Sequence, residues 1–359
     1  MKRITIILSM ITLMLTLSAC GGGGGGGGEE TSSASGQNAA AQTVEPAPVT
    51  EPAPVPETRP GSVPYEITIL GSLDGDSYAV GLNDASQVIG NYTDRSGRIN
   101  AFIWEEGVTR TVVAGGQASR INNQGQVVGW MEPNGHPEAY VYEGAGQLFR
   151  LNTVGGSSQA LAINDSGQTA GRITNGGEHA FLEENGSLRF IAGELDGYAI
   201  AMNNGGQVLI KRLDADGFHT LLWQDGALTD LGTLGGRNTQ GRDINDAGQV
   251  VGWSQTADGQ QHAFLWENGT MVDLAPLAGE FSSAVAINDR GQILLKSSDA
   301  AENRNLLYEN GQVTDLGNFG AGYAVGNDLN NQGEIVGWLS TTGGGMRAFL
   351  ARPTAAGGR

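Results

Sequence analysis

A ten-residue pattern repeats along this chain and constrains its fold more than any other feature. The clearest copy is Ile244–Trp253, which reads as a strand, a tight turn and a second strand. Its turn asparagine recurs at intervals of 39 to 43 residues, as Asn83, Asn122, Asn164, Asn203, Asn245, Asn288 and Asn330. A period in this range is typical of repeat architectures, in which each unit packs on its neighbours.

The residues of the pattern explain the turn. Asn245 and Asp246 can bond their own backbone, and Gly248 supplies the left-handed conformation that closes a short hairpin with a bulge. The glycine is present in every copy except the first, where Ser86 takes its place. A small residue, alanine or glycine, stands four places before each asparagine. Small residues suit an innermost strand, where neighbouring units crowd an axis.

Each period contains four strand-like pieces, as expected for a blade of a β-propeller. Residues 65–350 hold seven such periods, so we predict an all-β fold: a seven-bladed β-propeller of four-stranded antiparallel blades. The chain begins with a lone fourth-type strand, Tyr65–Leu70, and ends with a third-type strand, Arg347–Leu350. The N-terminal strand should therefore complete the last blade and close the ring. An open β-solenoid is the rival, but it would not need this matched offset.

The repeat motifs also carry a family resemblance. His262–Trp266 (His-Ala-Phe-Leu-Trp), Asp230–Gly236 (Asp-Leu-Gly-Thr-Leu-Gly-Gly) and Ile244–Trp253 together resemble the HAF repeat family of bacterial extracellular proteins. The resemblance covers essentially all of residues 65–350. The second and fourth repeats depart from it most, with Glu138 in place of the histidine and Ile210 in place of the glycine that ends Val-Val-Gly. The resemblance implies an extracellular location but no catalytic residues.

Residues 1–20 resemble a bacterial lipoprotein signal peptide. Lys2 and Arg3 precede an apolar run that is too short to span a membrane, and Leu17–Cys20 resembles the lipoprotein cleavage box. The resemblance implies acylation of Cys20, the only cysteine, and attachment to the membrane through that residue alone. Gly21 follows, where similar lipoproteins kept at the inner membrane usually have aspartate, which favours the outer membrane. The alternative is an ordinary secretory signal with a chance cysteine.

Residues 21–64 are predicted to be a disordered tether between the anchor and the propeller. An unbroken glycine run, Gly21–Gly28, is followed by a segment with seven of the eleven prolines in the chain. Glycine-rich segments behave as flexible coils and proline-rich segments as extended spacers. The glycine run lacks the Gly-Lys-Ser/Thr ending of a phosphate-binding loop. At the other end, residues 351–359 are predicted to be a flexible tail.

Three charged residues on the predicted inner strands are candidates for a ligand site in the central channel. Arg120, Asp243 and Asp328 stand two places before a turn asparagine, where the other four repeats have glycine or alanine. The alternative role is salt bridging between blades near the axis. No metal site is predicted, because the Asp214–Gly217 stretch lacks the remaining ligands of a calcium loop. No catalytic residue or cofactor is predicted either, since the sequence has no Gly-x-Ser-x-Gly elbow and no Cys/His pair.

The aromatic and histidine residues fall on repeat positions. Three tryptophans (Trp104, Trp223 and Trp266) belong to third strands and three (Trp130, Trp253 and Trp338) to second strands. Blade packing explains them better than a sugar-stacking platform does. His179, His219 and His262 share one repeat position in different blades, so we do not expect them to converge on a metal.

The charge balance bears on partners and function. The chain has 38 acidic and 20 basic residues, a formal charge of −18, with no basic patch for nucleic acid. We expect a monomeric, lipid-anchored binding or scaffold module of the cell envelope, with a protein or glycan as ligand. The alternative is a propeller enzyme acting on extracellular glycans or lactones, because the fold does not decide function.

The lipoprotein assignment predicts the behaviour of one variant. Cys20→Ser removes the thiol that would be acylated, so the variant should leave the membrane fraction or remain unprocessed. The measurement is fractionation followed by the mass of the N-terminal peptide. A Ser18→Ala variant, which keeps the cysteine, is the control. A correctly processed Cys20→Ser protein that stays in the membrane fraction would rule out acyl anchoring.

Overall fold

The computed structural model describes residues 65–71, 73–144, 146–151, 153, 156–193, 195–279, 281–298 and 303–354. All of them belong to one compact unit. The predicted signal peptide, Cys20, the tether and the last five residues of the predicted tail lie outside the described residues. No helix of the described part is long and apolar enough to cross a membrane.

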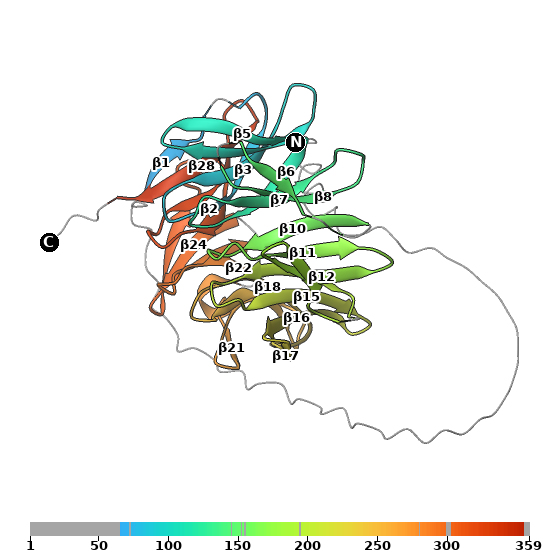
Figure 1. The fold of residues 1–359 in the computed structure, drawn as a ribbon. Helices are drawn as coiled ribbons and strands as arrows, with labels where there is room; N and C mark the ends of the chain where they lie inside the picture. The colour runs from blue at the N-terminus through green and yellow to red at the C-terminus, as the bar shows by residue number, and fades with distance from the viewer. Residues whose placement is uncertain are drawn as a thin grey trace, which may run out of the picture. The chain divides into compact units, whose positions relative to one another are not determined.

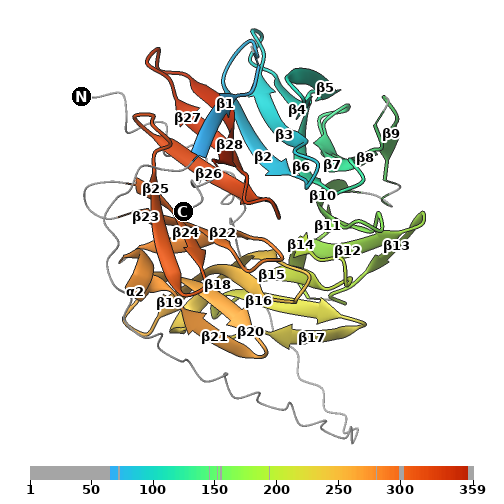
Figure 2. The same ribbon diagram turned by 90° about the vertical axis from the view of Figure 1, so that its left-hand side faces the viewer.

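The described chain forms seven four-stranded antiparallel sheets, which are the blades of a propeller (Figures 1 and 2). The first three blades consist, from the axis outward, of β2 (Ser77–Leu82), β3 (Val88–Thr93), β4 (Ile99–Glu105) and β5 (Val108–Ala114); of β6 (Gly116–Ile121), β7 (Val127–Met131), β8 (Glu138–Tyr142) and β9 (Leu148–Arg150); and of β10 (Ser157–Ile163), β11 (Thr169–Thr174), β12 (Glu178–Glu184) and β13 (Ser187–Phe190).

The next three blades follow the same order. They consist of β14 (Gly197–Met202), β15 (Val208–Asp214), β16 (Gly217–Gln224) and β17 (Ala227–Asp230); of β18 (Gly235–Ile244), β19 (Val250–Thr256), β20 (Gln261–Glu267) and β21 (Thr270–Asp273); and of β22 (Ser282–Ile287), β23 (Ile293–Ser298), β24 (Asn303–Glu309) and β25 (Gln312–Gly317). A one-turn helix, α2 (Ala275–Ala278), links the fifth blade to the sixth.

The seventh blade joins the two ends of the described chain. It contains β26 (Ala324–Leu329), β27 (Ile335–Ser340), β28 (Met346–Pro353) and, on the outside, β1 (Tyr65–Ile69). The antiparallel register between β1 and β28 runs from Tyr65 opposite Pro353 to Ile69 opposite Phe349. The predicted seven-bladed fold and its closure by the N-terminal strand are therefore confirmed. Because β28 continues to Pro353, the propeller extends three residues beyond the predicted boundary at 350.

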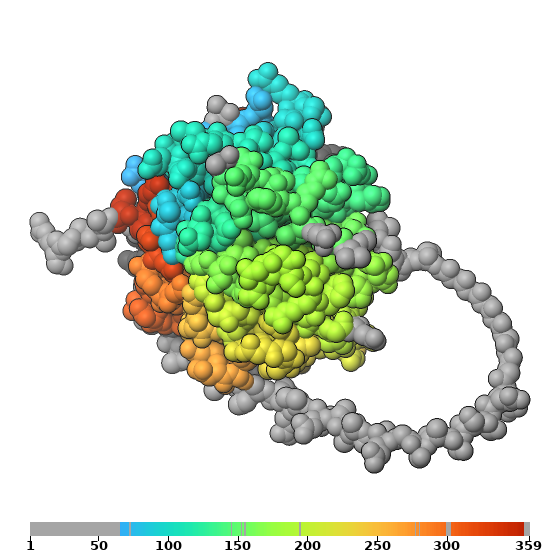
Figure 3. Space-filling view, viewed as in Figure 1, coloured from blue at the N-terminus to red at the C-terminus, as the bar shows by residue number. Residues whose placement is uncertain are grey.

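The core lies between blades rather than inside any one of them. The first strands of neighbouring blades contact one another all round the axis, and the buried clusters combine side chains of successive blades. Neighbouring blades pack directly against each other in the space-filling view (Figure 3). The small residue four places before each asparagine is buried, as in Ala79, Ala160 and Ala284 at 0% exposure. A larger side chain there would push two inner strands apart.

Each inner strand contains a β-bulge at the same repeat position. In the fourth blade, Ala199 pairs with Ile210 and Ala201 with Leu209, which leaves Ile200 as the extra residue. Residues 209 and 210 face opposite sides of the blade, so their partners do as well. The extra residue, Ile200, has no partner of its own on β15 and packs against a neighbouring hydrophobic cluster. The seven bulge residues are Val80, Ser119, Leu161, Ile200, Arg242, Val285 and Asn327.

Closure by β1 predicts a global cost for losing that strand. Leu70 is fully buried, its amide donates to the Ala348 carbonyl at 2.9 Å, and the Tyr65 hydroxyl donates to the Gly333 carbonyl at 3.2 Å. Burial of one leucine side chain alone contributes roughly 1.5–3 kcal/mol. A fragment that starts at Gly71 should therefore unfold well below one that starts at Gly61, measured by thermal unfolding. Equal midpoints, with both fragments monomeric, would contradict the closed ring.

Candidate functional site

The turn asparagines form a closed circle of hydrogen bonds around the axis. In the fifth blade, the Asn245 Nδ2 donates to the Gln249 Oε1 at 2.7 Å and to the carbonyl of Asn288, in the next blade, at 3.1 Å. Its Oδ1 accepts the backbone N–H of Gln249 at 2.9 Å. The same side-chain-to-carbonyl bond links every blade to the next, through Asn83, Asn122, Asn164, Asn203, Asn245, Asn288 and Asn330.

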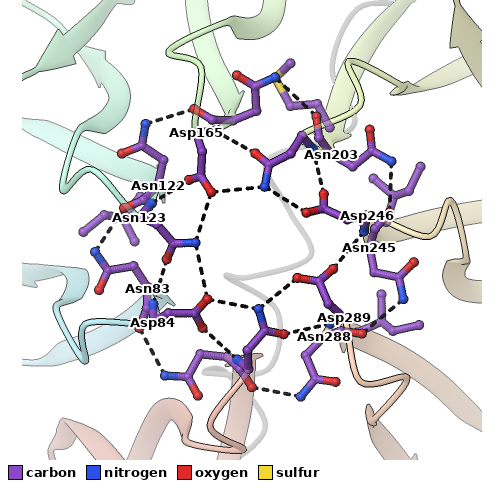
Figure 4. A pocket seen from close by; sticks show the side chains of 18 of the residues that line it. Asn83, Asp84, Asn122, Asn123, Asp165, Asn203, Asn245, Asp246, Asn288 and Asp289 are labelled. Carbon is purple, nitrogen blue, oxygen red and sulfur yellow. Dashed lines mark hydrogen bonds between the residues drawn. The ribbon is translucent and has the colours of Figure 1, made fainter.

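The residue after each turn asparagine forms a second circle at the mouth of the channel (Figure 4). Each backbone N–H donates to the Oδ1 of the equivalent residue in the next blade, at 2.8 or 2.9 Å. We call these seven residues the mouth ring: Asp84, Asn123, Asp165, Asn204, Asp246, Asp289 and Asn331. They line a polar hollow of about 160 Å³.

The mouth ring cannot alternate acid and amide around seven positions. Each of its three asparagines donates both Nδ2 protons to the Oδ2 atoms of the flanking aspartates, at 2.8 to 3.3 Å. Asp84 and Asp165 therefore receive two such bonds each. Asp246 and Asp289 are adjacent in the ring and receive one each. The site thus carries four carboxylates, and the two that are short of a donor stand side by side.

The sequence prediction missed the mouth ring, although its signal was present. An aspartate or asparagine follows the turn asparagine in all seven repeats. Such residues are common in turns for local reasons, so their type alone does not indicate a ring. Only the radial arrangement of the blades brings them together.

The three predicted channel residues lie deeper than the mouth ring, near the ends of the inner strands. The Asp243 Oδ2 accepts the backbone N–H of Ile287 in the next blade at 2.9 Å. The Asp328 Oδ2 likewise accepts the N–H of Leu82 across the ring closure at 3.1 Å. Arg120 acts electrostatically on both carboxylates from the second blade. The contacts of Asp243 and Asp328 bridge neighbouring blades near the axis.

Burial dominates the protonation of the two channel carboxyls. It raises the pKa of Asp243 to about 7, with the Arg120 guanidinium opposing the shift and the Asp328 charge adding to it. Burial also raises the pKa of Asp328, again against Arg120. One cation near two partly buried carboxyls cannot neutralise both, so the pair holds a proton to a higher pH than solvent-exposed carboxyls would.

The other residues singled out in the sequence serve the blades. Trp104, Trp223 and Trp266 are buried, whereas Trp130, Trp253 and Trp338 are partly exposed. His262 Nδ1 lies 2.8 Å from the Asp273 carboxylate, His219 lies between Asp214 and Asp230, and the His179 ring packs on Phe190. Asp214 also pairs with Arg212 at 3.0 Å. Among the described residues, no three histidine or acidic side chains are grouped to hold a metal ion.

The raised carboxyl pKa predicts how stability depends on pH. The folded protein holds a proton on Asp243 up to about pH 7, whereas an unfolded aspartate loses it near pH 4. Between these values the folded state binds more protons, so stability should fall as pH rises, by about 1.4 kcal/mol per unit of raised pKa. Asp243→Asn keeps an acceptor for Ile287 and should flatten this fall, measured by denaturant unfolding from pH 4 to pH 8.

A matched control for this prediction is Asp216→Asn, which neutralises an exposed aspartate outside the channel. In this control, the free energy of unfolding should depend on pH with the same slope as in the natural protein. If Asp243→Asn and Asp216→Asn showed the same slope of stability against pH, the buried carboxyl would not be its source.

Comparisons with known proteins identify the fold alone. No family model matches the chain, and no curated protein matches it. Solved structures do. The β-propeller domain of the trilobed protease from Pyrococcus furiosus, described as having an open velcro topology, aligns with a TM-score of 0.57 and 9% identity over 77% of this chain and 95% of that one. The acylaminoacyl peptidase of Pyrococcus horikoshii aligns with a TM-score of 0.55 and 11% identity, over 78% of this chain and 52% of that one. The structure of YCF48 bound to D1 peptide aligns with a TM-score of 0.53 and 10% identity, over 82% of this chain and 97% of that one. At these identities the matches support the propeller and say nothing of activity.

Proposed function

We propose that this chain is a lipid-anchored binding module of the bacterial cell envelope, whose mouth ring receives a basic side chain of a protein partner. The observation that carries the proposal is the donor deficit at Asp246 and Asp289. Six amide N–H groups donate to the Oδ2 atoms of four aspartates. Asp246 and Asp289 accept one such hydrogen bond each, whereas the other two aspartates accept two each. A lysine ammonium or an arginine guanidinium supplies both the missing donors and the missing positive charge.

The surroundings of the ring favour a cation. The described residues that line the hollow include no lysine, arginine or histidine. Asp246 and Asp289 are exposed to solvent, so a partner can reach them. Each is also held by its backbone bonds to neighbouring blades, and a fixed site loses little conformational entropy when it binds. The formal charge of −18 would further attract a basic partner at low ionic strength.

Two further considerations support a binding role in the envelope. Leu17–Cys20 resembles a lipoprotein cleavage box, and the glycine- and proline-rich segment that follows is suited to hold a domain away from a membrane. One structure of the same fold, YCF48, is described as bound to a peptide. A shared fold does not transfer a partner, so the ligand class rests on the ring itself.

The test is binding of a short lysine peptide to the protein by isothermal titration calorimetry. The probe is acetyl-Gly-Lys-Gly-amide, compared with acetyl-Gly-norleucine-Gly-amide, which keeps the aliphatic chain but carries no positive charge. We expect the lysine peptide to bind more tightly and its affinity to fall with added salt. The double variant Asp246→Asn/Asp289→Asn should lose at least tenfold in affinity, whereas Asp216→Asn should not. Equal binding of both peptides, or no change in the double variant, would refute a cation site at the mouth.

A further inference from the structure

A cleft of about 170 Å³ separates the sixth and seventh blades away from the mouth ring, with which it shares no residue. Its walls include Gln261, Phe281, Ser283, Lys296, Asn303 and Tyr323. The described lining residues include two cations, Lys296 and Arg304, and no carboxylate. In a chain with 38 acidic and 20 basic residues, a cleft of this composition favours an anionic ligand.

Lys296 is the central polar group of the cleft. It lies on β23, eight residues after the turn asparagine Asn288, and it is partly buried and lines the cleft. Its Nζ donates to the Asn327 Oδ1 at 3.3 Å, its only hydrogen bond among the described residues. An ammonium has three protons, so two remain for a ligand. Burial, followed by the Arg242 guanidinium, lowers the pKa of Lys296 to about 8, and no carboxylate among the described residues opposes the shift.

Two other blades carry a cation at this repeat position, and both cations have partners that Lys296 lacks. Arg172 pairs with Glu178 at 2.7 Å and lies over the ring of Tyr198. Lys211 donates to Gln240 at 3.4 Å, and its Nζ lies 4.4 Å from the centre of the Phe218 ring. A carboxylate or an aromatic ring offsets part of the charge in both cases, although burial still lowers the pKa of Lys211. Among the described residues, Lys296 is therefore the cation of this repeat position that has neither a carboxylate nor an aromatic ring as its partner.

The remaining walls resemble the surface that a sugar ring requires. Phe281 is 51% exposed and offers an apolar face to a ligand. Tyr323 is partly exposed, and its ring packs on Trp338 at 5.3 Å, which fixes its orientation. Ser283, Gln261 and Asn303 add hydroxyl and amide groups that can bond sugar hydroxyls. Arg304, which also pairs with Asp315 at 3.6 Å, is the second cation.

We propose that the cleft between the sixth and seventh blades binds an acidic sugar residue, with the carboxylate of the sugar on Lys296 and its ring against Phe281 and Tyr323. A carboxylate accepts hydrogen bonds from the two remaining N–H groups of the ammonium and supplies the missing negative charge. The apolar walls distinguish a sugar acid from a bare inorganic anion, which has no ring to cover them. The site extends the proposed binding role to a second surface and does not depend on the mouth ring.

The experiment is isothermal titration calorimetry of the whole protein with digalacturonate. The neutral digalactoside and inorganic phosphate are the comparison ligands. We expect digalacturonate to bind at least tenfold more tightly than either. Lys296→Met, which keeps the length of the side chain but removes its charge, should lose at least tenfold in affinity. Lys211→Met, the matched change at the same repeat position of the fourth blade, should stay within twofold of the natural protein.

The other outcomes are equally informative. Equal affinity for the neutral digalactoside would contradict a bond between the sugar carboxylate and Lys296. Binding of phosphate alone would contradict a sugar as the ligand. Unchanged affinity in Lys296→Met would overturn the site. Should Lys296→Met fail to fold, as judged by thermal unfolding, Phe281→Ala decides, because its exposed side chain is dispensable for the core. That variant should also lose at least tenfold in affinity, and unchanged binding would overturn the site. The double variant Asp246→Asn/Asp289→Asn should bind digalacturonate normally, which separates this site from the mouth ring.

Discussion

One buried hydrogen bond, repeated seven times, holds the blades in register: the amide of each turn asparagine donates to the backbone carbonyl of the next turn. The asparagine also shapes its own turn, because its oxygen accepts a backbone N–H four residues on, as in Asn245 and Gln249. A single side chain thus fixes the hairpin within a blade and the distance to the next blade. Removing it would leave several buried polar groups without partners, each costing roughly 1–3 kcal/mol. Because the last bond, from Asn330, returns to Asn83, the circle has no free end.

The number of blades has a consequence for chemistry. A ring with an even number of positions could alternate aspartate and asparagine so that every amide proton meets a carboxylate and no carboxylate is short. Seven positions force at least one pair of like neighbours, and in this chain the pair is Asp246 and Asp289. The rest of the mouth ring is internally satisfied. The closed scaffold therefore concentrates its unmet hydrogen-bonding capacity at one point beside the axis.

The fold could be predicted from sequence because its determinants are local and repeated. The asparagine–glycine turns, the four strand pieces in each period and the complementary chain ends were enough for seven blades and their closure. The mouth ring was not predicted, since Asp246 in isolation is an ordinary turn residue. The bond from Ile287 to Asp243 was not predictable either. It depends on a bulge that places Gly241 and Asp243, two residues apart, on opposite faces of the blade. The strand end at Pro353 is set by pairing with Tyr65, which is 288 residues away in the chain.

Comparison of equivalent positions separates framework from function in such a repeat protein. Arg172, Lys211 and Lys296 occupy one position of three blades, and two of them are compensated within the protein by a carboxylate or an aromatic ring. A position that accepts tryptophan in three other blades has no requirement for charge in the fold. An ammonium that is partly withdrawn from water without a compensating group is costly, so packing of the described residues does not explain Lys296. The same reasoning applies to the pair Asp246 and Asp289, where neighbouring carboxylates add repulsion that the ring does not need. Departures from the repeat that destabilise the scaffold are thus the positions where a ligand can supply the missing partner.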